Sequence, residues 1–449
     1  MSASDLPETI WTDELPSARR HRRRPRARWS PDQFLGPLAL AATAPLAFFP
    51  ERFPVEAMAI GLGMVAVPYL VRRANGGHFG AAGGALWVVL LLAGVAAPIG
   101  ALVSPAFWEV SWPELVRLVW GAAVLLGVLY FCADGGGNGR RHVGAHVAVA
   151  TAGFFAVGLA LGAIGLLSMR ANDKLPLIAG LVDRLPAING ALPFLGNAFN
   201  PNRVASVVML FVAPALALLL ASPGREMNRS LWWLGKGALL GLALFFGGAL
   251  LLTQSRTGLL AAALASGLVC LLAGRRGWLV LGVGLLLAVA TLDVFGPQGV
   301  LDVLAVQGEA PPEAGSLLER VLADRNMAGR LMIWRRAWYG IGDAPLTGVG
   351  LGVFQLAARE PYPALPDYRP DPDITHAHNL FLQTGLDLGL PGLLALMALL
   401  GFAVAALVRL FRATAPGTPA RLWAVGMAGA LLAFLVFNLL DAVTLGARP

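Results

Sequence analysis

The chain has 449 residues, of which 57% are hydrophobic and only 13% are charged, and its net charge is +8. An average soluble domain has about 25% charged residues, so a soluble chain of this length would lack the polar surface it needs. The apolar content also excludes a disordered chain, and 2 cysteines are too few for a disulfide scaffold. The composition therefore predicts an integral membrane protein.

Apolar stretches of about 17–25 residues can cross the hydrocarbon core of a bilayer as helices. We interpret eleven stretches of the chain in this way, although prolines interrupt the first. They lie near 33–50, 54–71, 84–104, 112–132, 143–167, 202–221, 231–253, 257–274, 277–295, 379–408 and 421–445. We therefore predict an all-α, polytopic membrane protein with about 11–12 transmembrane helices.

A polar, arginine-rich arm of 30 residues precedes the first apolar stretch, so we do not expect a signal peptide. Pairs or groups of arginines then recur in alternate short loops, at 72–73, 140–141, 225–229, 275–276 and 409–421. If every stretch spans the membrane, the arm and all of these loops lie on the same side. Because positively charged loops stay in the cytoplasm, this agreement predicts that the N-terminus is cytoplasmic. We interpret the arm as a topology determinant that attracts anionic lipid, not as a nucleic-acid-binding segment.

Two segments on the opposite side are too long to be simple turns, and they span about 168–200 and 296–378. Long segments between helices are usually functional. The second contains a dense cluster of charged, Trp, Tyr and His residues outside the arm. We therefore expect any chemistry to take place on the extracytoplasmic face.

His378 leads directly into the tenth apolar stretch, where a loop meets the membrane. Histidine is suited to proton transfer near neutral pH, so His378 is a candidate general base. Two alternatives are an interfacial histidine that caps the helix, and a metal site formed by His376 and His378 with Asp371 or Asp373. The loop has no further His or Cys, which argues against the metal site.

Arg256 lies in the Gln-Ser-Arg-Thr-Gly segment between the seventh and eighth apolar stretches. An arginine at membrane depth is costly, which makes it a candidate functional residue. Ser255 is a typical N-cap residue, and a capped helix start would direct its free N–H groups to the same point as the guanidinium. We expect this arrangement to bind phosphate, with a snorkelling arginine that stabilises a helix end as the alternative.

Arg330, Trp334 and Trp338 recur every four residues within the long loop and would share one face of a helix near 328–340. We expect this helix to lie along the membrane surface, with its tryptophans at the interface and Arg330 directed at a lipid-linked phosphate. The alternative is an amphipathic helix whose arginines contact only lipid headgroups. A weaker feature is Asn200-Pro201-Asn202-Arg203, which is typical of a helix cap and first turn.

These features resemble the O-antigen ligase superfamily, which also includes O-antigen and exopolysaccharide polymerases and protein O-oligosaccharyltransferases. The resemblance extends from about the sixth apolar stretch to the tenth. Its most specific part is the family pattern of His, then Asn, Ser or Gln, nine residues, and Gly-x-x-Gly. Here His378-Asn379, nine residues, and Gly389 to Gly392 satisfy it. Arg256 and Arg330 match the two arginine positions of the family.

The resemblance implies a GT-C-like membrane fold and metal-independent transfer of a glycan from undecaprenyl pyrophosphate at the periplasmic face of the bacterial inner membrane. His378 would be catalytic, Arg256 and Arg330 would bind the pyrophosphate, and no cofactor or metal would take part. The side chain of His376 would point elsewhere and matter less. The acceptor would be a glycan or lipid A-core in O-antigen ligation, or a second lipid-linked repeat unit in an O-antigen or exopolysaccharide polymerase. A single in-line displacement would invert the anomeric carbon. A transporter and a purely structural assembly protein are the alternative classes.

The same interpretation divides the chain into four parts. They are a cytoplasmic basic arm (1–30), nine transmembrane helices with a periplasmic loop near 168–200 (31–295), a large periplasmic catalytic loop (296–378) and C-terminal transmembrane helices (379–449). Many members of the superfamily have about twelve spans and a cytoplasmic C-terminus. The eleven stretches counted here would instead bring Pro449 to the outside.

Overall fold

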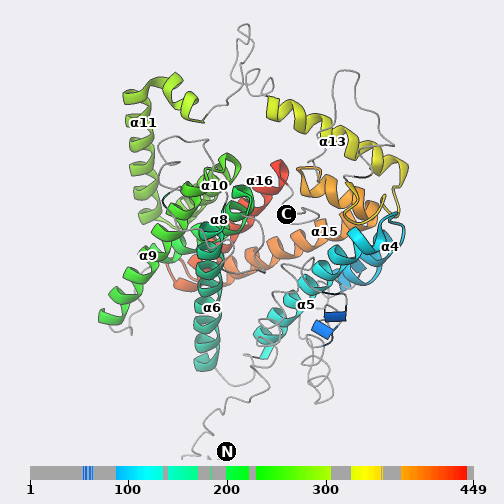
Figure 1. The fold of residues 1–449 in the computed structure, drawn as a ribbon. Helices are drawn as coiled ribbons and strands as arrows, with labels where there is room; N and C mark the ends of the chain where they lie inside the picture. The colour runs from blue at the N-terminus through cyan, green and yellow to red at the C-terminus, as the bar shows by residue number, and fades with distance from the viewer. Residues whose placement is uncertain are drawn as a thin grey trace, which may run out of the picture.

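The computed structural model describes residues 91–134, 140–169, 199–221, 229–304, 325–354 and 376–441, together with isolated positions between 54 and 89 and at 184 and 356. These residues are helical apart from their connections and one isolated bridge between Met169 and Phe199. Figure 1 shows the helices. They are η3 (Leu92–Ala96), α4 (Ala97–Leu102), η4 (Phe107–Ser111), α5 (Trp112–Asp134), α6 (Arg140–Leu167), α8 (Pro201–Leu219), α9 (Arg229–Thr253), α10 (Arg256–Leu272), α11 (Arg275–Leu304), α13 (Arg325–Asp343), α15 (Leu380–Ala413) and α16 (Pro419–Leu440).

The predicted all-α membrane fold is confirmed. Within the described ranges, 4 helices are long and apolar enough to cross a membrane. They are Pro201–Leu219, Trp232–Thr253, Leu380–Ala413 and Pro419–Leu440. The predicted stretch at 33–50 and most of 54–71 lie outside the described residues, so the total of 11–12 spans stays a prediction. Helix α11 continues to Leu304, beyond the predicted end at 295.

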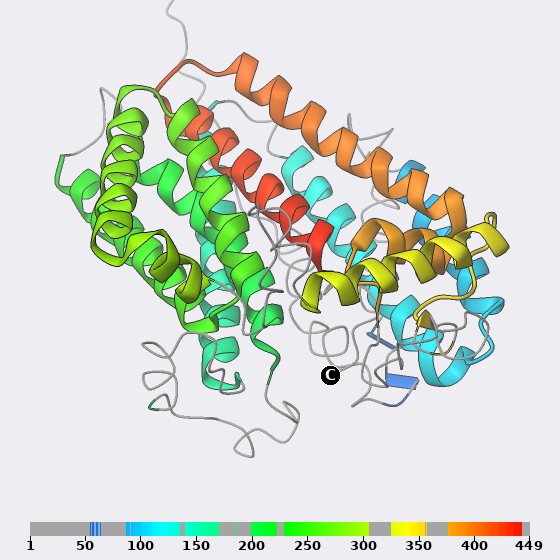
Figure 2. The same ribbon diagram turned by 90° about the horizontal axis from the view of Figure 1, so that it is seen from above.

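Helices α8, α10 and α16 form the centre of the molecule and pack through small residues (Figures 1 and 2). A Cβ atom on Gly429 would lie 2.7 Å from the Cβ of Ala213, and one on Gly258 would lie 2.9 Å from the Cβ of Ala205. Small residues let helices approach closely in a bilayer, where burial of apolar surface does not drive helix association. This packing brings the starts of α8 and α10 to the same end of the bundle.

Helix α15 is broken at Gly389, whose φ of 67° and ψ of −171° are not helical. Figure 2 shows its short first part and its long second part running in different directions. A Cβ on Gly389 would lie 2.7 Å from the carbonyl oxygen of Pro345, and that oxygen accepts the N–H of Leu390 at 2.7 Å. The first glycine of the Gly-x-x-Gly motif therefore forms a turn against the segment that follows α13.

Basic side chains cap the C-terminal ends of two helices. Lys236 donates to the carbonyl oxygens of Leu218, at 3.0 Å, and Leu219, while Arg276 donates to that of Ala221 at 3.1 Å. Arg421 donates to the carbonyl oxygen of Phe411 at 2.7 Å, near the end of α15. Cations suit the negative ends of helix dipoles. We call the end of α8 near Leu219, with Lys236 and Arg276, the basic end.

Candidate functional site

The segment that carries His378 is held from both sides. Asn379 is the N-cap of α15 and accepts the N–H groups of Phe381 and Leu382, each at 3.0 Å. The side-chain oxygen of Gln383 accepts the N–H of Ala377 at 2.7 Å. Between these two contacts His378 has a φ of 47°, in the left-handed region that non-glycine residues rarely adopt. Such a conformation persists only where its surroundings hold it.

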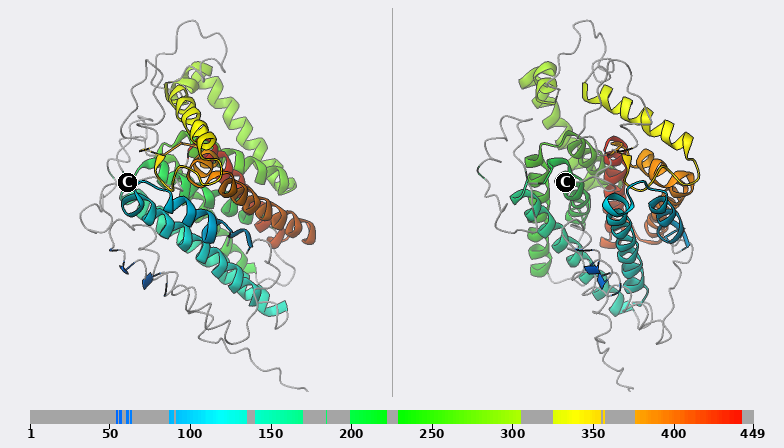
Figure 3. Two further views of the ribbon diagram at one scale, coloured as in Figure 1. Left: turned by 90° about the vertical axis from the view of Figure 1, so that its right-hand side faces the viewer. Right: turned by 45° about the vertical axis from the view of Figure 1, so that its right-hand side comes forward.

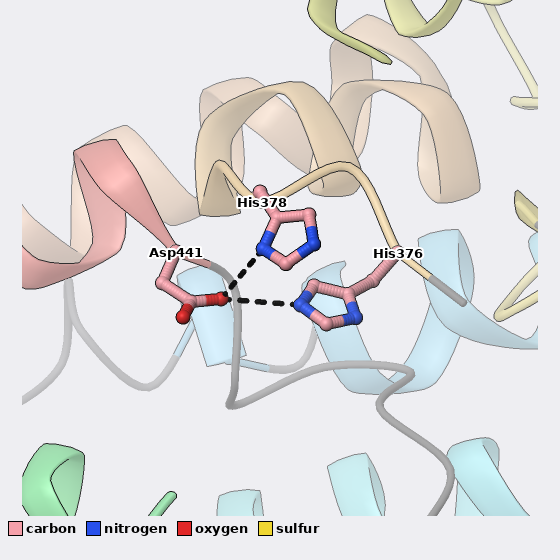
Figure 4. A group of neighbouring side chains, drawn as sticks. All are labelled: His376, His378 and Asp441. Atoms are coloured by element: carbon pink, nitrogen blue, oxygen red, sulfur yellow. Dashed lines mark hydrogen bonds and ion pairs between the residues drawn. The ribbon is translucent and has the colours of Figure 1, made fainter. Parts of the chain in front are cut away.

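Two histidines meet one buried carboxylate at this segment, as Figure 4 shows. His376 Nε2 and His378 Nδ1 each lie 3.1 Å from Asp441 Oδ1. Asp441 is 2% exposed and directly follows α16. Its other oxygen, Oδ2, accepts the side-chain N–H of Asn202 from the first turn of α8 at 3.3 Å. We call His376, His378 and Asp441 the His–Asp cluster.

The charges of the cluster follow from its burial and hydrogen bonds. Burial by itself would raise the pKa of Asp441, but the hydrogen bonds and charges of His376 and His378 outweigh it and hold the pKa below its ordinary value. Burial lowers the pKa of His376, and the charges of His378 and Arg203 lower it further against the opposing hydrogen bond to Asp441. At neutral pH the cluster therefore contains an ionised Asp441 and a neutral His376.

An ionised carboxylate can only accept hydrogen bonds, so the two ring nitrogens that face Asp441 must carry protons. For a neutral His378 this assigns the proton to Nδ1 and leaves the lone pair on Nε2, the nitrogen turned away from Asp441. The side chain of His378 is 27% exposed, whereas that of Asp441 is 3% exposed. Nε2, which does not face Asp441, is therefore the nitrogen of His378 that can take a proton.

Arg256 is the first residue of α10, directly after its N-cap Ser255, whose hydroxyl accepts the N–H of Gly258 at 3.3 Å. The predicted cap at Ser255 is therefore confirmed. Gly258 packs on Ala205 in the second turn of α8, so Arg256 lies at the same end of the bundle as Asn202 and the His–Asp cluster. The Nε of Arg256 is buried and has no hydrogen-bond partner among the described residues, which suits an anion.

Arg330 lies on α13, the predicted helix near 328–340 of the long loop. Trp334, one turn after Arg330, donates from Nε1 to the carbonyl oxygen of His378 at 3.4 Å. Ile333 and Ala337 pack in a buried cluster with Ala377, which joins α13 to the segment before α15. Figure 3 shows α13 next to the first part of α15. The helix that carries Arg330 is therefore fixed against His378.

Some details of the site differ from the sequence interpretation. We expected the side chain of His376 to point away from that of His378, but both contact the same oxygen of Asp441, and their ring centroids are 4.2 Å apart. The cap of α15 is Asn379, so helix capping does not account for His378. The predicted cap at Asn200 is confirmed, since its side chain accepts the N–H of Asn202 at 2.9 Å.

Asp441 was not identified from the sequence, and neither Asn202 nor Gln383 was given a role. A signal for Asp441 is present, because it is the only acidic residue that follows Asp387 in the chain and it ends a strongly apolar stretch. Asp371 and Asp373, the expected partners of a metal site with the two histidines, lie outside the described residues. Among the residues that the structure describes, the His–Asp cluster could hold a metal ion, with one ligand atom from each residue.

A second buried polar pair, Gln383 and Asp387, supports the segment that carries His378. The side-chain N–H of Gln383 donates to Asp387 Oδ1 at 2.8 Å, and both residues are almost fully buried. The backbone N–H of Gly352 also donates to Asp387. Buried polar groups need such partners, so Asp387 orients Gln383, and Gln383 in turn holds the backbone that precedes His378.

Comparison with known protein families gives a match to part of the chain. Residues 240–397 match the family model described as O-antigen ligase. The match includes α10, α13 and the first part of α15, and hence Arg256, Arg330, His376 and His378. It supports a ligase-type or polymerase-type transfer of a lipid-linked glycan. No curated protein matches the chain.

Proposed function

We propose that the chain is a metal-independent, inverting glycosyltransferase that moves a glycan from undecaprenyl pyrophosphate to an acceptor hydroxyl. The observation that carries this proposal is the hydrogen bond between His378 Nδ1 and the buried, ionised Asp441. It leaves a basic Nε2 on a histidine within the segment that matches the ligase family. The first acceptor we propose is lipid A-core, which is the acceptor that the resemblance to O-antigen ligases implies.

In this mechanism His378 takes the proton of the acceptor hydroxyl as the hydroxyl oxygen attacks the anomeric carbon. The new glycosidic bond forms as the bond from the anomeric carbon to the pyrophosphate oxygen breaks, and undecaprenyl pyrophosphate leaves. Asp441 stabilises the imidazolium that forms on His378 and holds its ring. A single displacement of this kind inverts the configuration of the anomeric carbon.

Arg256 and Arg330 bind the pyrophosphate in this proposal. Guanidinium groups bind phosphate oxygens through two parallel hydrogen bonds, and they would stabilise the negative charge that grows on the leaving group. Three observations support these roles: the buried Nε of Arg256 has no partner among the described residues, α10 begins at Arg256, and α13 contacts the backbone of His378. The arginines would replace the charge that a metal ion supplies in other transferases.

We propose further that the site faces the periplasm and that the protein lies in the bacterial inner membrane. The His–Asp cluster lies at the start of α8, whereas Lys236 and Arg276 lie at the other end of the same helix. Basic residues favour the cytoplasmic side of a membrane. The proposed division into a basic arm, membrane helices and a catalytic loop at 296–378 agrees with this orientation.

The test is a transfer assay with purified protein and an undecaprenyl-pyrophosphate-linked glycan. Lipid A-core, a second lipid-linked repeat unit and a peptide hydroxyl are offered in turn as acceptors. We expect transfer to lipid A-core, an inverted linkage in the product, and no loss of rate with a chelator. His378→Ala should abolish transfer while expression and thermal stability stay near those of the wild type.

Each arm can contradict a different part of the proposal. Transfer only to a second lipid-linked repeat unit would identify a polymerase and reject ligation. A chelator-sensitive rate or a retained anomeric configuration would reject the mechanism even if His378 proved essential. Full activity of a folded His378→Ala variant would reject His378 as the base.

A further inference from the structure

We propose that the His–Asp cluster is also an inhibitory binding site for Zn²⁺. Each residue of the cluster offers one metal-ligating atom, and the three atoms lie within 4.8 Å of one another. The cluster thus offers three ligands from two separate parts of the chain. The binding of zinc is independent of the proposed function, whereas inhibition depends on the proposed role of His378 as the base.

The spacing of the three atoms suits a tetrahedral zinc ion. Zinc bonds to imidazole nitrogen and carboxylate oxygen are about 2.0–2.2 Å long, which separates two ligand atoms by about 3.3 Å. The two nitrogens of the cluster are each 3.1 Å from Asp441 Oδ1. Small shifts of the rings would therefore let one ion bind all three atoms. A water molecule would complete the coordination, since His378 is partly exposed.

The types of ligand indicate which metal ions bind. Two imidazoles and one carboxylate suit zinc and similar transition metals, whereas Mg²⁺ and Ca²⁺ prefer oxygen ligands alone. Asn202 donates to the second oxygen of Asp441, a contact of the kind that orients a carboxylate ligand. The positive charge of Arg203, which also lowers the pKa of His376, opposes metal binding. We therefore expect weaker binding than at a structural zinc site.

Zinc binding would block the base through the tautomer of His378. A neutral imidazole that binds a metal through Nδ1 carries its proton on Nε2. Nε2 would then have no lone pair with which to accept a proton from the acceptor hydroxyl. Zinc would also displace the hydrogen bond from His378 Nδ1 to Asp441, because both use the same atoms.

The first experiment measures binding directly. Untagged, metal-free protein in detergent is titrated with ZnCl₂ by calorimetry, and with Co²⁺ while the visible absorption of tetrahedral cobalt is followed. His376→Ala should weaken zinc binding by about tenfold or more, since even an outer-shell contact is worth about 10–100-fold. The control is His146→Ala, because His142 and His146 are also two histidines close in sequence, and both belong to α6.

We expect His146→Ala to bind zinc as the wild type does, and Mg²⁺ not to compete. Equal zinc affinity in His376→Ala and the wild type, or no tetrahedral cobalt spectrum, would overturn the proposed site. The thermal stability of each variant is measured alongside, to exclude unfolding as the cause of weaker binding. If His376→Ala is catalytically inactive, the cobalt spectrum still decides whether the cluster binds a metal ion.

The second experiment measures transfer with added zinc. Zinc should inhibit the wild-type enzyme, a chelator should restore the rate, and the ratio of rates with and without zinc should approach one in His376→Ala. Zinc that binds to the cluster without inhibiting transfer would overturn the inhibitory role and also the assignment of His378 as base. Failure to bind zinc, together with an inactive but folded His378→Ala variant, would reject the zinc site and leave the proposed transferase standing.

Discussion

The two ends of helix α8 satisfy their polar groups in different ways. At the basic end, Lys236 and Arg276 donate to backbone carbonyl oxygens at the C-terminus of the helix. At the other end, Asn202 in the first turn contacts Asp441, which contacts both histidines. Either a lysine or an arginine can donate a hydrogen bond to a carbonyl oxygen, whereas the His–Asp cluster depends on the position of each atom. We therefore expect substitutions at the basic end to be tolerated and those at His378 and Asp441 to remove most or all of the activity.

The largest expected effect is that of Asp441→Asn. The amide of Asn can donate to His378 Nδ1, which would move the proton of the imidazole to Nε2 and remove the base. General-base catalysis contributes about 10²–10⁴-fold, so we expect the transfer rate to fall by about this factor. Initial rates with the lipid-linked donor measure the effect, with Arg276→Gln at the basic end as the control. A nearly normal rate in Asp441→Asn would contradict the assigned tautomer.

The next effect concerns the arginines. Arg256→Lys and Arg330→Lys keep the charge but lose the paired hydrogen bonds of the guanidinium. We expect kcat/KM for the donor to fall about 10–100-fold in each variant, which corresponds to about 1.4–2.7 kcal/mol. Arg276→Lys should have no effect, because an ammonium also serves the carbonyls of the basic end. Wild-type turnover of both variants at low donor concentration would exclude direct pyrophosphate binding.

A smaller effect, on stability, is expected at the break in α15. In Gly389→Ala the new Cβ would meet the backbone of Pro345 and Leu346, at a φ of 67°. A strained backbone conformation costs about 1–3 kcal/mol, so we expect a lower thermal midpoint by tryptophan fluorescence. Gly401→Ala, in open space on the same helix, should be neutral or stabilising by about 0.5–1 kcal/mol. Equal midpoints would show that the break tolerates a side chain.

The smallest effect is the pH dependence of stability. Because the pKa of His376 is lowered in the folded protein, the unfolded chain binds this proton first as the pH falls below about 6.5. Stability should thus be full above this pH and decrease below it. The pKa of Asp441 is also lowered, so this group stays ionised and contributes no change between pH 5 and 7. As the pH is lowered, the thermal midpoint should fall less in His376→Gln than in the wild type. An identical pH profile of the two proteins would contradict this assignment.

Much of the site could be predicted because its signals are local in the chain. The caps at Ser255 and Asn200 follow from residue type beside an apolar stretch, and the helix around Arg330 follows from its periodicity. The choice of His378, Arg256 and Arg330 came from motif spacing. Their catalytic and binding roles remain predictions until they are measured.

The sequence by itself determined the class of the protein, since hydropathy and charge are properties of short stretches that a bilayer sorts directly. The tertiary structure decided how His378 is oriented. Its partner Asp441 lies 63 residues later in the chain, and Asn202 lies 239 residues before that aspartate. These residues meet because Gly258 and Gly429 let α8, α10 and α16 approach closely. Contacts of this kind depend on how whole helices pack, which no local pattern specifies.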